Sequence, residues 1–230
     1  RPPRSTLDRS SAASDVYKRQ PLIVFDDADM ETAVEGCMVA KMRNLGEACT
    51  AANRIYVHEN IAEVFKDKFS KRMGSLKVGN GLDKSVDVGP LVNAETRDKV
   101  AYFVNDAIKK GAELTVGGNN IDGHGYYFTT TVLFNVPDSA ECLNDEIFGP
   151  VAAIQTFKDT EEVITRANNT EYGLVAYVFT EDMKKGMLVC ERLDYGMVGL
   201  NRGLVSDPAA PFGGTKQSGL GREGGHEGML

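Results

Sequence analysis

The stretch VAAIQTFKDTEEVITRANNTEYGLVAYVFT, residues 151–180, decides the fold class. Its apolar runs predict strands at Val151–Phe157 and Leu174–Phe179, and the segment between them predicts a helix at Thr160–Asn168. A strand, a helix and a second strand joined by short links are typical of parallel strand pairs. This stretch therefore predicts an α/β fold.

The same alternation continues on both sides of this stretch. Further strands are predicted at Leu22–Phe25, Arg54–Val57, Glu113–Val116, Phe128–Phe134 and Met197–Leu200. Further helices are predicted directly after Phe25 and at Ile61–Met73, Ala94–Lys110 and Met183–Arg192. We therefore expect a largely parallel sheet flanked by helices, with a glycine-rich loop over the last thirty residues.

The first two predicted helices each carry an apolar stripe. In the helix after Phe25, acidic residues occupy the first turn, and the stripe comprises Ala33, Val34, Cys37, Met38 and Lys41. In the second helix the residues expected to face inward are Ile61, Val64, Phe65 and Phe69.

The composition excludes several classes of function. A formal net charge of −7 disfavours a nucleic-acid partner or an anionic membrane surface, and no run of 18 apolar residues occurs. The four cysteines lack a C-x-x-C spacing, which indicates free thiols in a reducing compartment, so we expect a cytoplasmic protein. The three histidines are scattered, and no His/Cys cluster has metal-ligand spacing, so no metal site is expected.

Residues 1–20, RPPRSTLDRSSAASDVYKRQ, differ in character from the rest of the chain. They contain five basic residues, two acidic residues, four serines and two adjacent prolines, without apolar periodicity. This composition is typical of a disordered or foreign segment. We therefore expect one folded unit over residues 21–230.

The segment RNLGEACTAANR, Arg43–Arg54, is the strongest candidate for chemistry. It places Cys49 after a glycine turn, where a helix gives way to a strand, so the thiol could be presented into a cleft. A thiolate is a strong nucleophile at neutral pH. Most free cysteines are small buried apolar residues, however, and this segment alone favours that structural interpretation.

Three further segments occur in order with the cysteine segment: DEIFGP (Asp145–Pro150), NNTEYGLVAYVFT (Asn168–Thr180) and PFGGTKQSGLGRE (Pro211–Glu223). Together the four resemble the signature segments of the aldehyde dehydrogenase superfamily. Their order and spacing fit residues 21–230 as the catalytic domain of that family. The resemblance implies an NAD- or NADP-dependent enzyme in which Cys49 adds to the aldehyde, hydride passes to the nicotinamide, and water hydrolyses the thioester.

The resemblance also implies roles for other residues. Glu146 and Phe148 match the family's contacts to the nicotinamide ribose, and Phe212 with the following glycines matches the mouth of the active site. Asn201 matches a position near the site to which we assign no role.

Arg43 and Ser206 resemble the residues that hold the far carboxylate of the substrate in succinate-semialdehyde dehydrogenases. Arg43 could instead be a cation favoured by the C-terminus of a helix. Succinate semialdehyde is thus the expected substrate, with glutarate semialdehyde, a neutral or amino aldehyde, or release of product to coenzyme A as alternatives. A non-catalytic domain that folds or binds only within an assembly is a further alternative.

The chain also departs from the family pattern. The cofactor-binding domain precedes this region in the family and is mostly missing, and the family's general base would fall at Asp15, where the neighbouring residues do not match. Leu230 precedes the strand through which family subunits associate. We therefore expect a fragment that is inactive alone, from a longer protein that acts as a homo-oligomer on a small aldehyde.

Overall fold

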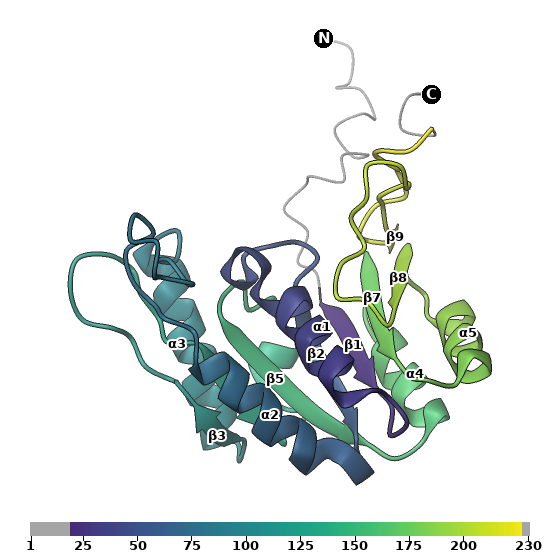
Figure 1. Ribbon diagram of the computed structural model, residues 1–230, viewed down its shortest axis with the longest axis horizontal. Helices are drawn as coiled ribbons and strands as arrows, with labels where there is room; N and C mark the ends of the chain where they lie inside the picture. Colours follow the sequence, from purple (N-terminus) through teal and green to yellow (C-terminus); the bar gives the residue numbers. More distant parts are fainter. Residues whose placement is uncertain (1–18, 227–230) are drawn as a thin grey trace.

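Residues 19–226 of the chain are described by a computed structural model, and their framework is one seven-stranded sheet (Figure 1). In spatial order the sheet contains β3 (Glu113–Val116), β4 (Thr131–Phe134), β5 (Val151–Phe157), β2 (Ala52–His58), β1 (Gln20–Val24), β7 (Val175–Phe179) and β8 (Met197–Leu200). Every neighbouring pair is parallel except β3 and β4. The expected largely parallel α/β fold is therefore confirmed.

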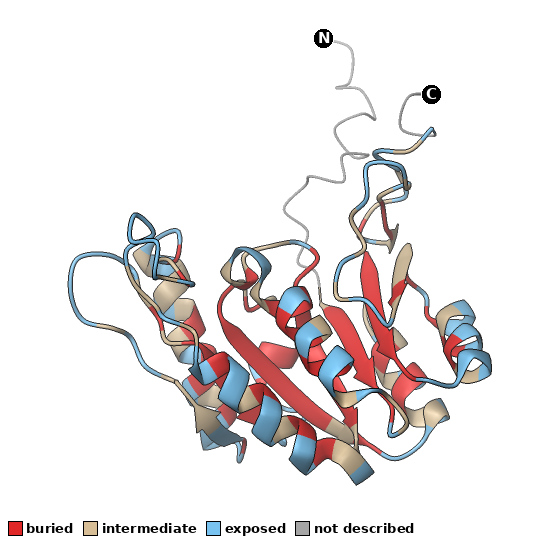
Figure 2. Ribbon diagram, viewed as in Figure 1, coloured by how far each residue is buried: buried red, intermediate tan, exposed pale blue. Residues whose placement is uncertain are grey.

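Helices cover both faces of the sheet. They are α1 (Met30–Met42), α2 (Ala62–Gly74), α3 (Ala94–Lys109), α4 (Thr160–Asn168) and α5 (Met183–Arg192), with single 3-10 turns at η2 (Arg43–Gly46), η3 (Glu59–Ile61) and η4 (Glu141–Leu143). Helices α1 and α2 pack in one apolar cluster, whereas α3 and the pair α4 and α5 belong to two others. The central strands β1, β5 and β7 are buried along almost their whole length, whereas β3 and β8 at the two edges are only partly buried (Figure 2).

The alternation of side chains along β1 shows how one strand supplies both layers. Leu22 and Val24 belong to the cluster of α1 and α2, while Ile23 belongs to the cluster of α4 and α5. Successive residues of a strand point to opposite faces, and a strand covered on both faces is apolar throughout. This explains why continuous apolar runs predicted the strands.

Side-chain caps set where the helices begin. Asp29, Asn93, Asp159 and Asp182 each accept a hydrogen bond from a backbone N–H in the first turn of α1, α3, α4 and α5 respectively. Such caps satisfy donors that have no partner within the helix and contribute about 1 kcal/mol each.

Three expectations need correction in detail. Val64, expected to face inward, is 53% exposed, because the buried stripe of α2 is the narrower set Ala62, Phe65, Phe69 and Met73. The strand expected from Phe128 begins at Thr131. Gln20 belongs to β1 and is buried, and the carbonyl of half-buried Arg19 accepts from Arg54. The folded unit therefore includes these two residues of the segment expected to lie outside it. Residues 1–18 lie outside the described residues.

The glycine-rich C-terminal region forms an arm beside β7 and β8 (Figure 1). It contributes β9 (Thr215–Lys216), which pairs antiparallel with β6 (Tyr172–Gly173) in a separate small sheet. Within residues 19–226, none of the helices combines the length and apolar character needed to cross a bilayer. The same residues contain no group of three His, Cys, Asp or Glu side chains that could hold a metal ion.

Candidate active site

Cys49 lies in the loop between η2 and β2, and its side chain is exposed. Cys37 and Cys142 are buried, and Cys190 is half-buried. Burial raises the pKa of all three of these thiols, that of Cys142 to about 12, so they are protonated at neutral pH. Among the four free thiols, Cys49 is therefore the most accessible to a molecule in solution.

The loop before Cys49 has an unusual backbone. Asn44, Leu45 and Gly46 have φ values of 50°, 60° and 79°, three successive residues in the left-handed region. Glycine adopts this region freely, whereas a non-glycine residue there costs about 1–3 kcal/mol. The Asn44 side chain compensates locally by donating from Nδ2 to the Glu47 carbonyl at 2.8 Å. A strained turn thus presents the exposed thiol.

The backbone around Cys49 is held by two buried side chains of the sheet. Gln20 donates from Nε2 to the Cys49 carbonyl at 2.9 Å and accepts from the Val175 N–H at 3.0 Å. The Tyr177 hydroxyl donates to the Thr50 carbonyl at 2.9 Å. Sequence reasoning missed both supports, since Gln20 fell in the segment expected to be foreign and Tyr177 resembled an ordinary strand residue.

Arg43 and Ser206, the expected carboxylate receptor, are brought together across 163 positions of sequence. Arg43 Nη1 donates to Ser206 Oγ at 3.3 Å. The loop that contains Ser206 packs closely against α1 at Gly203 and Gly36. A Cβ on Gly203 would lie 2.0 Å from the carbonyl oxygen of Gly36, so the close approach requires glycine. A guanidinium and a hydroxyl side by side on an accessible surface can bind a carboxylate.

Arg43 and Cys49 both contribute to the electrostatic environment of the Tyr177 hydroxyl. Burial raises the pKa of the Tyr177 hydroxyl, the hydrogen bond to Thr50 and the charge of Arg43 lower it, and Cys49 raises it. The candidate nucleophile and the candidate receptor therefore act on the same buried phenol.

Glu146 and Phe148, the expected cofactor contacts, are half-buried in the segment that follows η4. Phe148 has a φ of 51°. The next residue, Gly149, touches the cysteine loop so closely that a Cβ on Gly46 would lie 2.3 Å from the Gly149 carbonyl oxygen. The structure thus places the expected cofactor segment directly against the cysteine loop.

Phe212 and Asn201 are held by contacts of their own. The backbone N–H and carbonyl of half-buried Phe212 pair with those of Glu223 within the C-terminal arm. Asn201, with a φ of 53°, accepts from the Thr180 N–H at 3.0 Å and donates to the Thr180 carbonyl at 2.9 Å. These two hydrogen bonds connect the end of β8 to the end of β7, a structural contribution that the sequence did not suggest.

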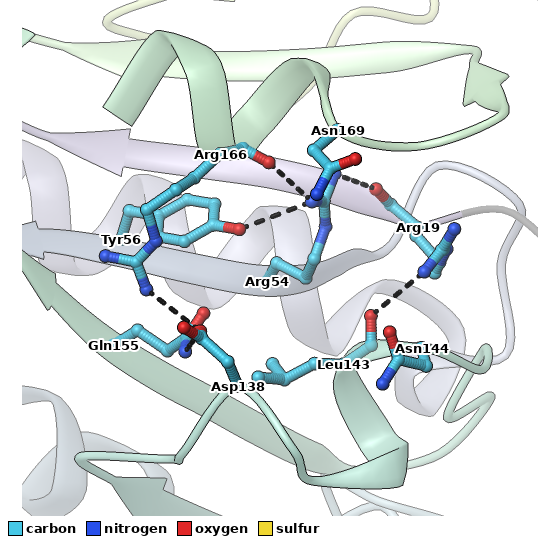
Figure 3. A pocket seen from close by; sticks show the side chains of 9 residues that line it. All are labelled: Arg19, Arg54, Tyr56, Asp138, Leu143, Asn144, Gln155, Arg166 and Asn169. Carbon is cyan, nitrogen blue, oxygen red and sulfur yellow. Dashed lines mark hydrogen bonds and ion pairs between the residues drawn. The ribbon is translucent and has the colours of Figure 1, made fainter. Parts of the chain in front are cut away.

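Among the pockets of the described residues, one lies outside this group and another includes Ser206. Figure 3 shows one of about 200 Å³ lined by Arg19, Arg54, Tyr56, Asp138, Leu143, Asn144, Gln155, Arg166 and Asn169. Arg54 and Arg166 already bond backbone carbonyls there, and Arg166 also pairs with Asp138 and Glu162. The second pocket, about 560 Å³, is formed by β8 and the loop after it and includes Ser206. Cys49 lines neither pocket.

The domain is thus a largely parallel α/β sheet that presents an exposed cysteine on a strained loop. The sequence pattern described as "Aldehyde dehydrogenase family" matches residues 18–230. The chain belongs to this family.

Curated relatives extend the similarity. The chain is 51% identical over 209 residues to a succinate-semialdehyde dehydrogenase from Paenarthrobacter nicotinovorans, covering 91% of this chain and 46% of that protein. It is 46% identical to a glutarate-semialdehyde dehydrogenase from Pseudomonas putida, covering 91% and 43%. The chain thus spans about half the length of the curated relatives it matches.

A solved structure gives the same result for the fold. Succinate-semialdehyde dehydrogenase from Burkholderia pseudomallei superposes with a TM-score of 0.91 at 45% identity, covering 94% of this chain and 45% of that one.

Proposed function

We propose that this chain carries the nucleophile and the substrate-carboxylate receptor of a semialdehyde dehydrogenase that oxidises succinate semialdehyde to succinate with NAD or NADP. The contact between Arg43 and Ser206 is the observation that carries this proposal. It joins two residues that match the carboxylate receptor of one subfamily, and Arg43 lies six residues before the exposed Cys49. The names of the relatives point to the same group of enzymes.

Cys49 performs the covalent chemistry in this proposal. Its thiolate adds to the aldehyde carbon, forming a carbon–sulfur bond and an oxyanion, which the backbone N–H of Cys49 can bind. Loss of hydride from that carbon gives a thioester, and water then releases the acid and returns the thiol. Gln20 and Tyr177 donate to the carbonyls of Cys49 and Thr50, and these bonds restrict the backbone that carries this N–H.

The residues of the 145–150 segment fit a nucleotide ribose. Glu146 offers carboxylate oxygens that can accept from two sugar hydroxyls, and Phe148, two residues further along the chain, is half-buried like Glu146. NAD or NADP, when bound, supplies the hydride acceptor. Relatives named as NADP(+)-dependent and a solved neighbour that is an NAD⁺ complex support this pair of cofactors.

Arg43 and Ser206 would select the substrate. A guanidinium binds a carboxylate through charge-assisted hydrogen bonds, and the Ser206 hydroxyl adds a further donor. A receptor at a fixed distance from the nucleophile discriminates chain length weakly, because one methylene is worth about 1–3 kcal/mol. Glutarate semialdehyde is therefore the second candidate substrate, consistent with the relative of that name.

The test uses the complete product of the gene that encodes this chain. Nicotinamide reduction is followed with succinate semialdehyde, glutarate semialdehyde and propanal, each with NAD and with NADP. We expect the semialdehydes to be preferred, Cys49→Ala to abolish turnover, and Arg43→Ala and Ser206→Ala to raise KM for the semialdehydes but not for propanal. Arg72→Ala, which removes an exposed arginine of α2, is the matched control. Equal oxidation of propanal by the wild type would refute the substrate assignment.

We also propose that the complete gene product is a homo-oligomer in the cytoplasm. The resemblance to the family supports the assembly, and the four free thiols support a reducing compartment. Light scattering on the purified gene product gives its mass directly, and a monomeric mass would refute the assembly.

A further inference from the structure

Cys49 lies in a tight turn of the backbone. The N–H of Ala51 donates to the carbonyl of Ala48 at 2.9 Å, and Cys49 and Thr50 are the two central residues of this turn. The closing bond of a β-turn leaves the carbonyls of its two central residues without a partner inside the turn. The orientation of Cys49 therefore depends on the groups that bind these two carbonyls from other parts of the chain.

Tyr177 on β7 binds the second of these carbonyls. Its hydroxyl donates to the Thr50 carbonyl at 2.9 Å, in a bond that is buried at both ends and joins residues 127 positions apart. The carbonyl of Cys49 accepts from Gln20 in a bond that is only partly buried. A hydrogen bond in a water-poor interior is stronger than the same bond near solvent. Tyr177 therefore provides the firmer of the two restraints.

The side chain of Tyr177 is itself held rigidly. Its backbone lies between β1 and β8, opposite Leu22 and Gly199, and its ring packs in the apolar cluster of α1 and α2 with 1% of the residue exposed. Burial raises the pKa of Tyr177, so the hydroxyl keeps its proton and remains a donor near neutral pH.

The hydroxyl of Tyr177 is not required for packing. A phenylalanine ring would fill the same apolar space, and burying a hydroxyl is unfavourable unless it finds a hydrogen-bond partner. That partner is the Thr50 carbonyl. The turn that carries Cys49 therefore accounts for a hydroxyl at this place in the core.

The turn also follows a strained segment. Residues 44–46 have three successive left-handed conformations, and such backbone persists only where the surrounding contacts over-determine it. Tyr177 supplies a contact on the other side of the thiol, because Thr50 directly follows Cys49. Loss of this contact would allow the strained loop to relax and the thiol to move.

We propose that Tyr177 is a positioning residue, whose hydroxyl fixes the turn of residues 48–51 so that the Cys49 thiol and backbone N–H keep the orientation in which they meet the aldehyde. This inference rests on the proposed function, since it takes Cys49 as the nucleophile. Tyr177 acts through the turn and not on the aldehyde itself. A displacement of about 1 Å at a reacting group can lower a rate about a hundredfold, so the loss of this hydroxyl should lower kcat.

The first arm of the test measures the turn in this chain by amide hydrogen exchange. The Ala51 N–H closes the turn, so its exchange rate reports how often the turn opens. We expect this amide in the wild type to exchange at least about tenfold more slowly than in an unstructured peptide. Tyr177→Phe keeps the ring and removes the hydroxyl, and it should accelerate the exchange about tenfold.

The second arm measures the kinetics of the complete gene product with succinate semialdehyde, with kcat referred to the concentration of folded enzyme determined by circular dichroism. We expect Tyr177→Phe to lower kcat about tenfold and to change KM less than about twofold. The reason is that Arg43 and Ser206, the proposed carboxylate receptor, are both retained. A hydroxyl that only stabilised the fold would leave the kcat of the folded enzyme unchanged.

Tyr195→Phe is the matched control. The Tyr195 hydroxyl is also buried and donates to a backbone carbonyl, that of Ala167 at 2.6 Å, in the apolar cluster of α4 and α5. This variant loses a comparable bond on the other face of the sheet, so we expect wild-type kcat and wild-type exchange of Ala51. An equal fall in kcat in both variants would overturn the positioning role.

The outcomes separate the two proposals. An unchanged kcat in Tyr177→Phe overturns the positioning role and leaves the proposed function intact. A lower kcat without faster exchange of Ala51 also overturns it, because the effect would not act through the turn. A wild-type gene product that oxidises neither semialdehyde overturns both proposals. Should Tyr177→Phe fail to fold, the wild type still decides, since an Ala51 amide that exchanges as fast as in an unstructured peptide belongs to a turn that is not held.

Discussion

Lys41 and Arg54 are two buried cations that differ in their hydrogen-bond partners. Arg54 is 4% exposed and donates to the Tyr56 hydroxyl and to the carbonyls of Arg19 and Arg166, at 3.0–3.3 Å (Figure 3). It also donates to the Tyr195 hydroxyl at 3.1 Å and to the Ala167 carbonyl at 2.9 Å. Lys41 is fully buried and has an amide oxygen at 3.5 Å and the charge of Glu146. One cation is enclosed by short hydrogen bonds, whereas the other is held in an environment that lowers its pKa.

The difference shows what each site contributes. Two of the carbonyls bound by Arg54, those of Arg166 and Ala167, belong to the last turn of α4, where the helix dipole favours positive charge. The third belongs to Arg19, the residue before β1, so Arg54 connects α4 and β2 to the residue that leads into β1. Lys41 makes no comparable set of bonds, and its burial lowers stability. Residues kept despite such a penalty are concentrated at functional sites.

The largest expected effect is the loss of Arg54. Arg54→Met keeps the apolar stem and removes all of its hydrogen bonds, leaving buried carbonyls and phenols with fewer donors. We expect the free energy of unfolding to fall by about 3–5 kcal/mol, measured by urea denaturation. A loss below about 1 kcal/mol would mean that Arg54 does not hold α4 to the sheet.

The next effect concerns the contact between Gly46 and the carbonyl oxygen of Gly149. Gly46→Ala forces alanine to a φ of 79° and brings its Cβ to 2.3 Å from the Gly149 carbonyl oxygen, so the two segments must separate. We expect a destabilisation of about 2–4 kcal/mol by urea denaturation. Gly81→Ala is the matched control, because no atom lies within 4 Å of the added Cβ. Equal effects at both positions would contradict the close contact.

Lys41→Met should act in the opposite direction and depend on pH. The folded pKa of Lys41, about 8, lies below its unfolded value of 10.5, so between these values only the unfolded chain keeps the proton. Below pH 8 the free energy of unfolding of the wild type is reduced by the full cost of burying the charged amine. This cost decreases as the pH rises from 8 towards 10.5. We expect the variant to be more stable at pH 7 by up to about 3 kcal/mol, with a difference that shrinks at pH 9. A constant difference across pH would contradict the burial of a charged amine.

The smallest expected effect tests how far the Arg54 network is redundant. The Tyr195 hydroxyl donates to the Ala167 carbonyl at 2.6 Å and accepts from Arg54 at 3.1 Å. Tyr195→Phe removes both bonds, although Arg54 still donates to Ala167 at 2.9 Å. We expect a loss of about 1 kcal/mol by urea denaturation. The exposed pair formed by Tyr102 and Glu141 supplies the control, because Tyr102→Phe should cost less.

The local sequence pattern was sufficient to predict the limits of several helices and strands. Val151–Phe157, Thr160–Asn168 and Met183–Arg192 have the predicted limits, since apolar runs and helical spacing follow directly from burial. Val64 shows where spacing is insufficient, because the width of a buried stripe depends on which neighbours cover it.

The candidate site could be predicted only in part. Cys49, Arg43 and Ser206 were identified by resemblance, and their roles remain predictions. Local spacing could not have shown that Arg43 meets Ser206 over 163 positions, or that Gly46 meets Gly149 over 103. The supports of the cysteine loop were missed for the same reason, because long-range partners leave no periodic signal in the sequence.

The pairing of β1 has a consequence for how this chain reaches its fold. One edge of β1 pairs with β2, for example Leu22 with Ile55, and the other pairs with β7, where Leu22 meets Tyr177. On a ribosome the second edge therefore stays open until more than 150 further residues have been made. Such non-local pairing slows folding, and an uncovered apolar edge invites association with other chains meanwhile. Yield of folded protein should consequently depend on chaperones and on growth temperature more than on the final stability of the sheet.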